Sequence, residues 1–410
     1  MPEQDPNPTA ATESAFGMGP VLPKERIQVI DILRGWAIFG ILLVNMGAIY
    51  NIQTTWTGTG DVALTGADRA VELLIRFFGE GKFYTLFSFL FGLGFALQMG
   101  RAEARGGRFV PLYRRRLFAL MLFGLANVTV FLWDAQLLIY AVLGFLLLLF
   151  RTCSPRTILV AAYICLLIPR VHIAVVEGVH ELRLVDPQAA QQATREAGHR
   201  AAESRAETDQ AHRVQSRGSY RELVALHAQW FVRWHFSFAY FPWHIPYLRW
   251  WIGGAFPLLL LGFYAGRRRI FENIPAHLSF IRKVMWWGLG LGLVGNLMWV
   301  VTSEMSNPAW PYLTRHVGQL FQAVGQPALC FFYASAIILL AQQEAWKTRL
   351  AVLAPVGRIA LSNYLFQILV FAMTFYSYGL GLYGKVGPAM GLALTLLIFA
   401  VQILLSVWWV

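Results

Sequence analysis

Apolar stretches alternate with short polar segments along almost the whole chain. Many of these stretches reach the length of about 20 residues that a helix needs to cross a lipid bilayer. We therefore predict an all-α polytopic membrane protein with about ten transmembrane helices. In chain order, the spans are expected over residues 27–50, 81–99, 117–133, 135–150, 157–176, 252–266, 284–302, 317–341, 354–378 and 386–410.

The polar segments define the predicted domain organisation. Residues 1–25 contain acids and prolines without an apolar core, so we expect a disordered cytoplasmic tail rather than a signal peptide. Residues 26–176 then form an N-terminal membrane half of five helices, and residues 252–410 form a C-terminal membrane half. Residues 177–251 are predicted to be an extracytoplasmic helical insert, which ends in an interfacial segment (230–251) of interleaved Trp, Tyr, His and Arg.

Local signals add detail to these elements. Residues 71–78 are amphipathic and are expected to lie along the outer interface. Pro169 is expected to kink or end its helix, because proline cannot donate the backbone hydrogen bond. Gly288, Gly292 and Gly295 lie on one helix at spacings that permit close contact with a neighbouring helix.

Composition and charge limit the classes of protein to which this chain can belong. Hydrophobic residues make up 57% of the chain and aromatic residues 15%, which excludes a typical soluble globular protein. The net charge is +12, but Lys and Arg cluster beside apolar stretches, as at 114–116 and 267–269. This is the positive-inside pattern, so we expect cytoplasmic termini and no nucleic-acid partner. The 3 cysteines form no CxxC motif, and neither a disulfide framework nor a metal site is expected.

The first span carries polar residues on one face. Asp31 and Arg34 are three residues apart and are therefore neighbours on a helix. Asn45 follows Arg34 by close to three helical turns and points roughly the same way, about 16 Å deeper. In one interpretation, the ion pair anchors the helix at the lipid headgroups and Asn45 bonds a neighbouring helix. In the other, this face lines a polar path from the cytoplasmic surface.

Five separated motifs together resemble the YeiB family of bacterial inner-membrane proteins, over nearly all of the chain except residues 177–250. They are ERIQVIDILRGWAIFGILLVN, FFGEGKFYTLFSFLFGLGFAL, RRRLFALMLFGL, LIYAVLG and VGRIALSNYLFQ…YSYGLGLYG. A GPLEWLWR-like tail of the family would follow Val410, so the chain is expected to continue beyond this residue. The family is largely uncharacterised and is grouped with a wider set of transmembrane acyltransferases.

The resemblance implies transfer of an acyl group from a cytoplasmic acyl-CoA to an envelope sugar or lipid acceptor, with acyl-CoA as a co-substrate and no bound cofactor. In type 3 acyltransferases, a Leu-Asp-x-Leu-Arg motif is followed eleven residues after the Arg by a catalytic His. Asp31 and Arg34 match this motif, but the histidine position is Asn45. Asn127 stands where YeiB-like proteins often carry another His. An amide is not a general base near neutral pH.

On the cytoplasmic side, we expect Arg34, Arg114, Arg116 and Arg358 to bind the phosphates of the donor. Guanidinium groups suit phosphate because they offer forked donors and keep their charge. The alternative for these residues is topological retention and binding of anionic lipids, which are expected partners in either case.

On the outer side, Glu80, Lys82 and Asp134 cap predicted spans. Asp134 is a candidate to hold or deprotonate an acceptor hydroxyl, if its surroundings raise its pKa. The alternative is a turn aspartate that bonds its own backbone. Asn363 and Tyr364 begin a polar face of the ninth span, which either binds substrate or joins helices.

Histidine is the other candidate for proton transfer. His227, His235, His244 and His316 fall on the predicted outer side. A single interfacial histidine among tryptophans is more often part of an aromatic belt.

Two other functions are consistent with the same residues. A transporter or flippase would bind a substrate on the buried polar face without chemistry, which agrees with Asn at both histidine positions. A receptor or scaffold would use the insert at 177–222 as a partner-binding surface.

Overall fold

A computed structural model describes residues 26–50, 64, 66–183, 185–236, 251–304 and 311–410, and within these ranges all the regular elements are helices. The predicted tail at 1–25, residues 51–63 and 65 after the first span, and residues 237–250 of the aromatic segment lie outside the described residues. The all-helical prediction is confirmed.

The first part of the chain forms the helices α2 (Gln28–Tyr50), α4 (Gly66–Phe78), α5 (Lys82–Ala104), α6 (Phe109–Thr129), α7 (Gln136–Leu148), α8 (Pro155–Arg183), α9 (Pro187–Arg217) and α10 (Tyr220–Phe236). The second part forms η3 (Trp251–Ala255), α12 (Phe256–Arg267), α13 (Ile274–Glu304), α14 (Pro311–Leu340), α15 (Glu344–Ala351), α16 (Leu353–Arg358), α17 (Ala360–Phe375) and α18 (Pro388–Trp409).

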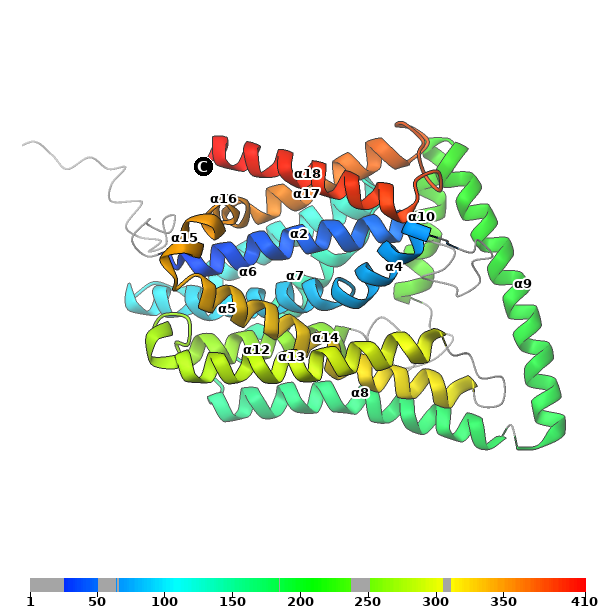
Figure 1. Cartoon of the computed structure of the whole chain (residues 1–410), viewed down its shortest axis with the longest axis horizontal. Coiled ribbons are helices and arrows are strands. Elements are labelled where there is room, and N and C mark those ends of the chain that lie inside the picture. The colour runs from blue at the N-terminus through cyan, green and yellow to red at the C-terminus, as the bar shows by residue number, and fades with distance from the viewer. Residues whose placement is uncertain (1–25, 51–63, 65, 184, 237–250, 305–310) are drawn as a thin grey trace, which may run out of the picture.

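Most of these helices lie side by side in one bundle, with their axes near its long axis (Figure 1). One end of the bundle holds the start of α2, the helices α15 and α16, and Val410; we call it the basic end. At the opposite end, α9 lies across the bundle, and we call this the insert end (Figure 1).

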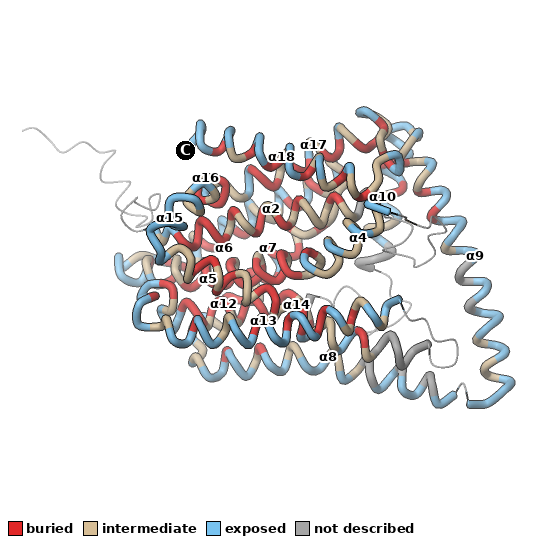
Figure 2. The backbone as a smooth tube through the Cα atoms, in the orientation of Figure 1, coloured by how far each residue is buried: buried red, intermediate tan, exposed pale blue. Residues whose placement is uncertain are grey.

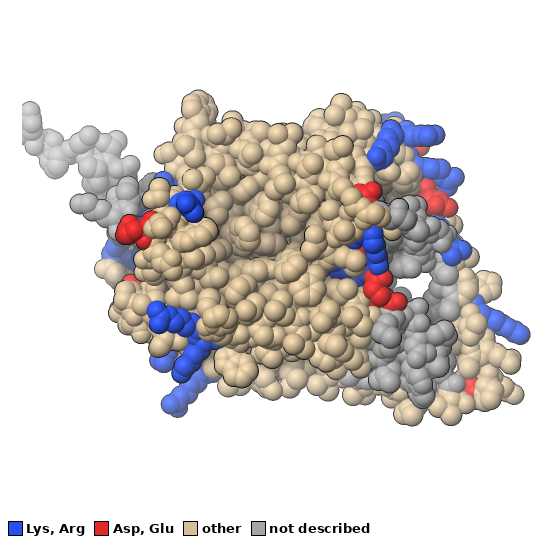
Figure 3. Space-filling view, in the orientation of Figure 1, with Lys and Arg blue, Asp and Glu red and all other residues tan. Residues whose placement is uncertain are grey.

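Among the described residues, 6 segments are long and apolar enough to cross a membrane. They are Gln28–Gly47, Gly66–Ala104, Pro155–His172, Ile274–Glu304, Val317–Leu340 and Pro388–Trp409, and the shorter apolar helices are Gln136–Leu148 and Ala360–Phe375. Large apolar side chains such as Leu122, Trp287 and Leu404 are exposed on the outside, while the buried residues line the interior (Figure 2). On the face in Figure 3, charged side chains lie towards the two ends with an uncharged band between them. The protein is a membrane protein.

Two predicted elements differ from the structure. The ninth span was expected to be continuous over 354–378, but it is divided into α16 and α17 at Ile359, whose backbone leaves the helical region. This break lets α16 cross α2 closely. Of the two effects expected of Pro169, an end of the helix is excluded, because α8 continues to Arg183. Arg170 on the next position donates to the carbonyls of Leu166 and Gly253, so a side chain supplies hydrogen bonds around the proline.

Glycines set the closest helix crossings. A Cβ on Gly292 would lie 2.8 Å from the backbone of Leu329, and one on Gly295 would lie 2.6 Å from Gly325. The prediction that these glycines permit close helix contact is therefore confirmed, and the partner is α14. At the crossing of α2 and α16, a Cβ on Gly357 would lie 1.8 Å from the carbonyl oxygen of Asp31.

We expect Gly357→Ala to destabilise the protein by at least about 1–3 kcal/mol, because the added methyl group must push α16 away from α2. Gly100 on α5 is the matched control, since nothing lies within 4 Å of a Cβ at that position. The measurement is thermal unfolding of both variants in detergent. Equal melting temperatures for Gly357→Ala and Gly100→Ala would contradict the close crossing.

Candidate functional site

At the basic end, Asp31 joins two helices. Its carboxylate lies 3.3 Å from Arg34 on α2 and 3.8 Å from Arg358 on α16. The neighbouring helix α5 has a glycine at position 94, where a Cβ would come within 3.3 Å of the Arg34 guanidinium. Asp31 and Arg34 are therefore paired as their spacing predicts, and Arg358 completes the pair from a distant part of the sequence.

Positive charge exceeds negative charge around Asp31. Arg26, Arg101 and Arg116 are near enough to act electrostatically on Asp31 or Arg34. We define the basic cluster as Asp31 together with its surrounding arginines, which are Arg26, Arg34, Arg101, Arg116 and Arg358. The side chains of Arg34 and Arg358 keep 32% and 34% of their surface exposed, while that of Asp31 keeps 11%. The guanidinium groups are thus accessible to a soluble or lipid phosphate, which they suit in charge and geometry.

Arg114 does not share this position. It is exposed on α6, two residues from Arg116. Residues two apart on a helix point in different directions, so the side chains of Arg114 and Arg116 lie on different faces of α6. Of the predicted donor-binding arginines, the structure brings together Arg34, Arg116 and Arg358.

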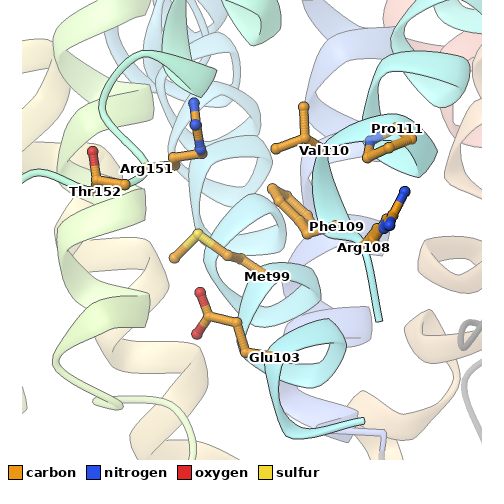
Figure 4. A pocket seen from close by; sticks show the side chains of 8 residues that line it. All are labelled: Met99, Glu103, Arg108, Phe109, Val110, Pro111, Arg151 and Thr152. Atoms are coloured by element: carbon orange, nitrogen blue, oxygen red, sulfur yellow. The ribbon is translucent and has the colours of Figure 1, made fainter. Parts of the chain in front are cut away.

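A shallow pocket of about 350 Å³ lies between the end of α5, the start of α6 and the connection from α7 to α8 (Figure 4). Arg108, Arg151 and Glu103 give its lining mixed charge, and Met99 and Phe109 give it an apolar floor. Because a carboxylate is present beside the two arginines, this pocket suits a polyanion less well than the basic cluster does.

At the insert end, Asp134 lies in the connection between α6 and α7. Its Oδ1 accepts a hydrogen bond from the backbone N–H of Gln136, at 2.5 Å. Its backbone carbonyl accepts a hydrogen bond from the Asn127 amide at 2.8 Å. The carboxylate therefore makes the local turn contact that was one of its two interpretations, and Asn127 holds the turn from the last part of α6.

Burial changes the acidity of Asp134. Desolvation raises the pKa of this carboxyl to about 6, against the opposing hydrogen bonds from Gln136. The phenols of Tyr140 and Tyr364 are near enough to sense its charge, and Tyr140 also bonds Ser88 at 2.8 Å. We call Asn127, Asp134, Tyr140 and Tyr364 the turn cluster. The Asp134 carboxylate can accept a proton near neutral pH, as a general base requires.

Asn363 belongs to a different network, which joins α17 to α18. Its amide donates to the carbonyl of Val356 at 3.1 Å and to the hydroxyl of Ser406 at 3.0 Å. Gln402 donates to the Asn363 carbonyl at 2.9 Å, and Gln367 donates to the carbonyl of Ile38 on α2 at 3.2 Å. These contacts support the helix-joining interpretation of Asn363. Sequence analysis missed Gln367 and Gln402, although their helical spacing from Asn363 and Ser406 is a signal.

We expect Asn363→Ala to lower stability by about 1–3 kcal/mol, because buried hydrogen-bonding groups of Val356 and Ser406 lose their partner. Gln210→Ala on α9 is the control, since that amide is exposed. The measurement is the detergent melting temperature together with ligand binding. A variant that melts normally but fails to bind acyl-CoA would instead place Asn363 in the site.

The contacts of Lys82 are those of a residue that stabilises the fold. It is fully buried, and its Nζ donates to the carbonyl of Arg76 near the end of α4 at 3.1 Å. Lys82 and Arg76 each lie 5.4 Å from the ring centre of Trp299. Arg76 also pairs with Glu304 at 2.7 Å. Lys82 therefore caps α4, and its predicted role in substrate binding gains no support from these contacts.

The remaining predicted residues lie elsewhere. Asn45 is half-buried on α2. His227 is on α10, where its ring lies 5.8 Å from that of Tyr376. The side chains of His235, His244 and His316 lie outside the described residues.

Comparisons with known proteins agree on one family. Residues 265–410 match the family described as a protein of unknown function, DUF418. The chain is 34% identical over 396 residues to the uncharacterized protein YxaH of Bacillus subtilis (strain 168), covering 95% of this chain and 91% of YxaH. It is 27% identical over 411 residues to the uncharacterized protein YeiB of Escherichia coli (strain K12), covering 94% of this chain and 92% of YeiB. No solved structure matches the chain.

Proposed function

We propose that this chain, which belongs to the YeiB-like DUF418 family of membrane proteins, is a transmembrane acyltransferase, as its motifs led us to expect. In this proposal an acyl group passes from a cytoplasmic acyl-CoA to the hydroxyl of an envelope sugar or lipid. The observation that carries the proposal is the half-buried Asp134, a carboxylate with a pKa of about 6 in the α6–α7 connection, near the point where Val130 contacts the insert helix α10.

The donor binds at the basic cluster. Arg34 and Arg358 offer partly exposed guanidinium groups to the phosphates of CoA, and Arg116 and Arg101 add positive potential. Charge-assisted bonds from arginine to phosphate are among the stronger hydrogen bonds in proteins. The thioester end of the donor extends from this site into the bundle.

The acceptor binds at the turn cluster. Asp134 removes the proton of the acceptor hydroxyl, whose oxygen attacks the thioester carbonyl. The new C–O bond replaces the C–S bond, and the proton passes from Asp134 to the departing CoA thiolate. Asn127 holds the Asp134 turn in place, and it does not accept a proton.

The orientation follows from the charge pattern. We infer about ten spans, cytoplasmic termini and a bacterial inner membrane, with the basic end facing the cytoplasm. Exposed Arg282 and Lys283 precede the exposed pair Trp286 and Trp287 on α13. Basic residues followed by tryptophans are typical of a cytoplasmic membrane interface. The insert helices α9 and α10 then lie outside.

A second function is translocation of a polar or lipid-linked substrate. It is favoured by the amides at Asn45 and Asn127, which bind substrate but do not transfer protons. In that case the basic cluster and the turn cluster are two ends of a path, and no thioester is cleaved.

Binding of the donor separates these functions. A ligand that binds only the folded state stabilises it by about 2.7 kcal/mol at 100 times its dissociation constant. We expect acetyl-CoA or a longer acyl-CoA to raise the melting temperature of the purified protein in detergent more than CoA or ATP does. A well-folded protein whose melting temperature no CoA species changes would overturn the acyltransferase proposal and favour translocation.

A further inference from the structure

The insert is fastened to the bundle at a defined contact. The Ser377 N–H donates to the carbonyl of Gln215 on α9 at 3.0 Å. The Tyr376 hydroxyl joins the two bundle segments at this contact, because it donates to the carbonyl of Leu132 at 2.8 Å. Tyr220 on α10 donates to the carbonyl of Val130 at 3.1 Å. We call this contact the cap junction. It consists of residues 208–230 of α9 and α10, the α6–α7 connection at 130–136 and the loop at 376–387.

The cap junction contains buried polar atoms without partners. Among the described residues, five of the buried side-chain atoms that make no hydrogen bond belong to the junction: Trp133 Nε1, Gln136 Oε1, Gln215 Oε1, His227 Nε2 and Tyr383 Oη. Others, such as Asn296 Oδ1 and Gln367 Oε1, lie within the bundle. They come from both sides of the junction, the insert and the bundle. Native proteins pair almost all buried polar atoms, so five unpaired atoms from four segments that meet at one junction need an explanation.

The chemistry of these atoms is mixed and uncharged. The indole of Trp133 only donates, the amide oxygen of Gln215 only accepts, and the Tyr383 hydroxyl does both. Burial lowers the pKa of His227 to about 4, so this imidazole is neutral at pH 7. A neutral ligand with several hydroxyl groups satisfies donors and acceptors together, whereas a phosphate would require cations.

Aromatic rings surround the same place. The rings of Tyr376 and Tyr378 lie 5.8 Å apart, and the ring of Tyr220 is 5.6 Å from that of Tyr378. His227 lies 5.2 Å from Trp230. Apolar walls with a few placed polar groups are typical of small-molecule sites, and aromatic faces accept the C–H faces of a sugar ring.

We propose that the cap junction is a carbohydrate-binding site, in which sugar hydroxyls pair with Gln215 and His227 of the insert and with Trp133 and Tyr383 of the bundle. Because these atoms are sealed from solvent, α10 must move away from the 376–387 loop for a sugar to enter. Trp133 is next to Asp134, so the bound sugar lies beside the turn cluster. That the sugar is the acyl acceptor rests on the proposed function, but its binding does not.

The test is a thermal shift of the purified protein, without acyl-CoA, in N-acetylglucosamine, glucose, mannose and galactose. We expect at least one of these sugars to raise the melting temperature. Tyr383→Phe and Gln215→Met each remove an unpaired buried atom, so each is expected to raise the ligand-free melting temperature while weakening sugar binding at least tenfold. Tyr163→Phe is the control, since Tyr163 is exposed on α8 outside the cap junction, and its sugar affinity is expected to be unchanged.

Two results would overturn the carbohydrate site. One is a wild-type melting temperature that none of the four sugars changes. The other is a sugar-induced shift that Tyr383→Phe and Gln215→Met leave intact. Sugar binding without acyl transfer would overturn only the proposed function, and acyl transfer without sugar binding would overturn only this site.

Discussion

Asp134→Asn is expected to lower acyl transfer by at least about 100-fold, the usual contribution of a general base. The change keeps the turn, because an asparagine oxygen also accepts the hydrogen bond of the Gln136 N–H. It removes the proton acceptor, because an amide does not take up a proton near neutral pH. The measurement is the rate of CoA release in the presence of acceptor, and the rate of the wild-type protein is expected to fall as the pH drops below about 6.

The same variant is expected to melt at a higher temperature at pH 7.5. Burial raises the pKa of Asp134 from 3.8 to about 6, so the folded protein holds this proton more tightly than the unfolded chain does. The charged form therefore costs stability above pH 6, on the order of 3 kcal/mol, and the cost is relieved as pH falls from 6 towards 3.8. Asp134→Asn removes this cost at every pH. A variant that loses stability at pH 7.5, or keeps full activity, would contradict the assigned role.

Arg34→Ala is expected to weaken acyl-CoA binding by about 10- to 100-fold, since a hydrogen bond to a charged group contributes about 1.5–3 kcal/mol. The protein should remain folded, because Asp31 keeps its contact with Arg358. Arg34→Lys is expected to recover part of the affinity, as lysine keeps the charge but loses the forked geometry. The measurement is the acyl-CoA dissociation constant at one fixed salt concentration.

Arg114→Ala is the matched control for this experiment. Arg114 is exposed on α6 and is outside the basic cluster. Its removal is expected to change the acyl-CoA dissociation constant less than about twofold, because screening weakens distant exposed charges. Equal effects of Arg34→Ala and Arg114→Ala would show that acyl-CoA is held by general positive charge.

Local patterns in the sequence predicted local structure well. The spacing of Asp31 and Arg34 predicted their contact, which the structure shows at 3.3 Å. The glycines of α13 predicted its close approach to another helix, although not that the partner is α14. The helical nature of the insert was also predicted, and α9 confirms it. Each of these signals is carried by residues within a few helical turns.

Contacts between distant segments could not be predicted in this way. Tyr376 bonds Leu132 across 244 positions, and Gln367 bonds Ile38 across 329 positions. No periodicity within a helix specifies such a partner. For the same reason, the cap junction was missed, because its polar atoms come from four segments that meet only in the fold. The break at Ile359 was missed because an apolar stretch looks alike whether or not its backbone is continuous.

The most direct test of the central claim is transfer of labelled acetyl groups by the purified protein in proteoliposomes. [¹⁴C]Acetyl-CoA is supplied outside, with an extract of bacterial envelope lipids and glycans as the acceptor, and radioactivity is counted in the fraction free of CoA. We predict that label accumulates in this fraction with the wild-type protein and not with Asp134→Asn. No accumulation with acetyl-CoA or any longer acyl-CoA, or equal accumulation with Asp134→Asn, would contradict the account.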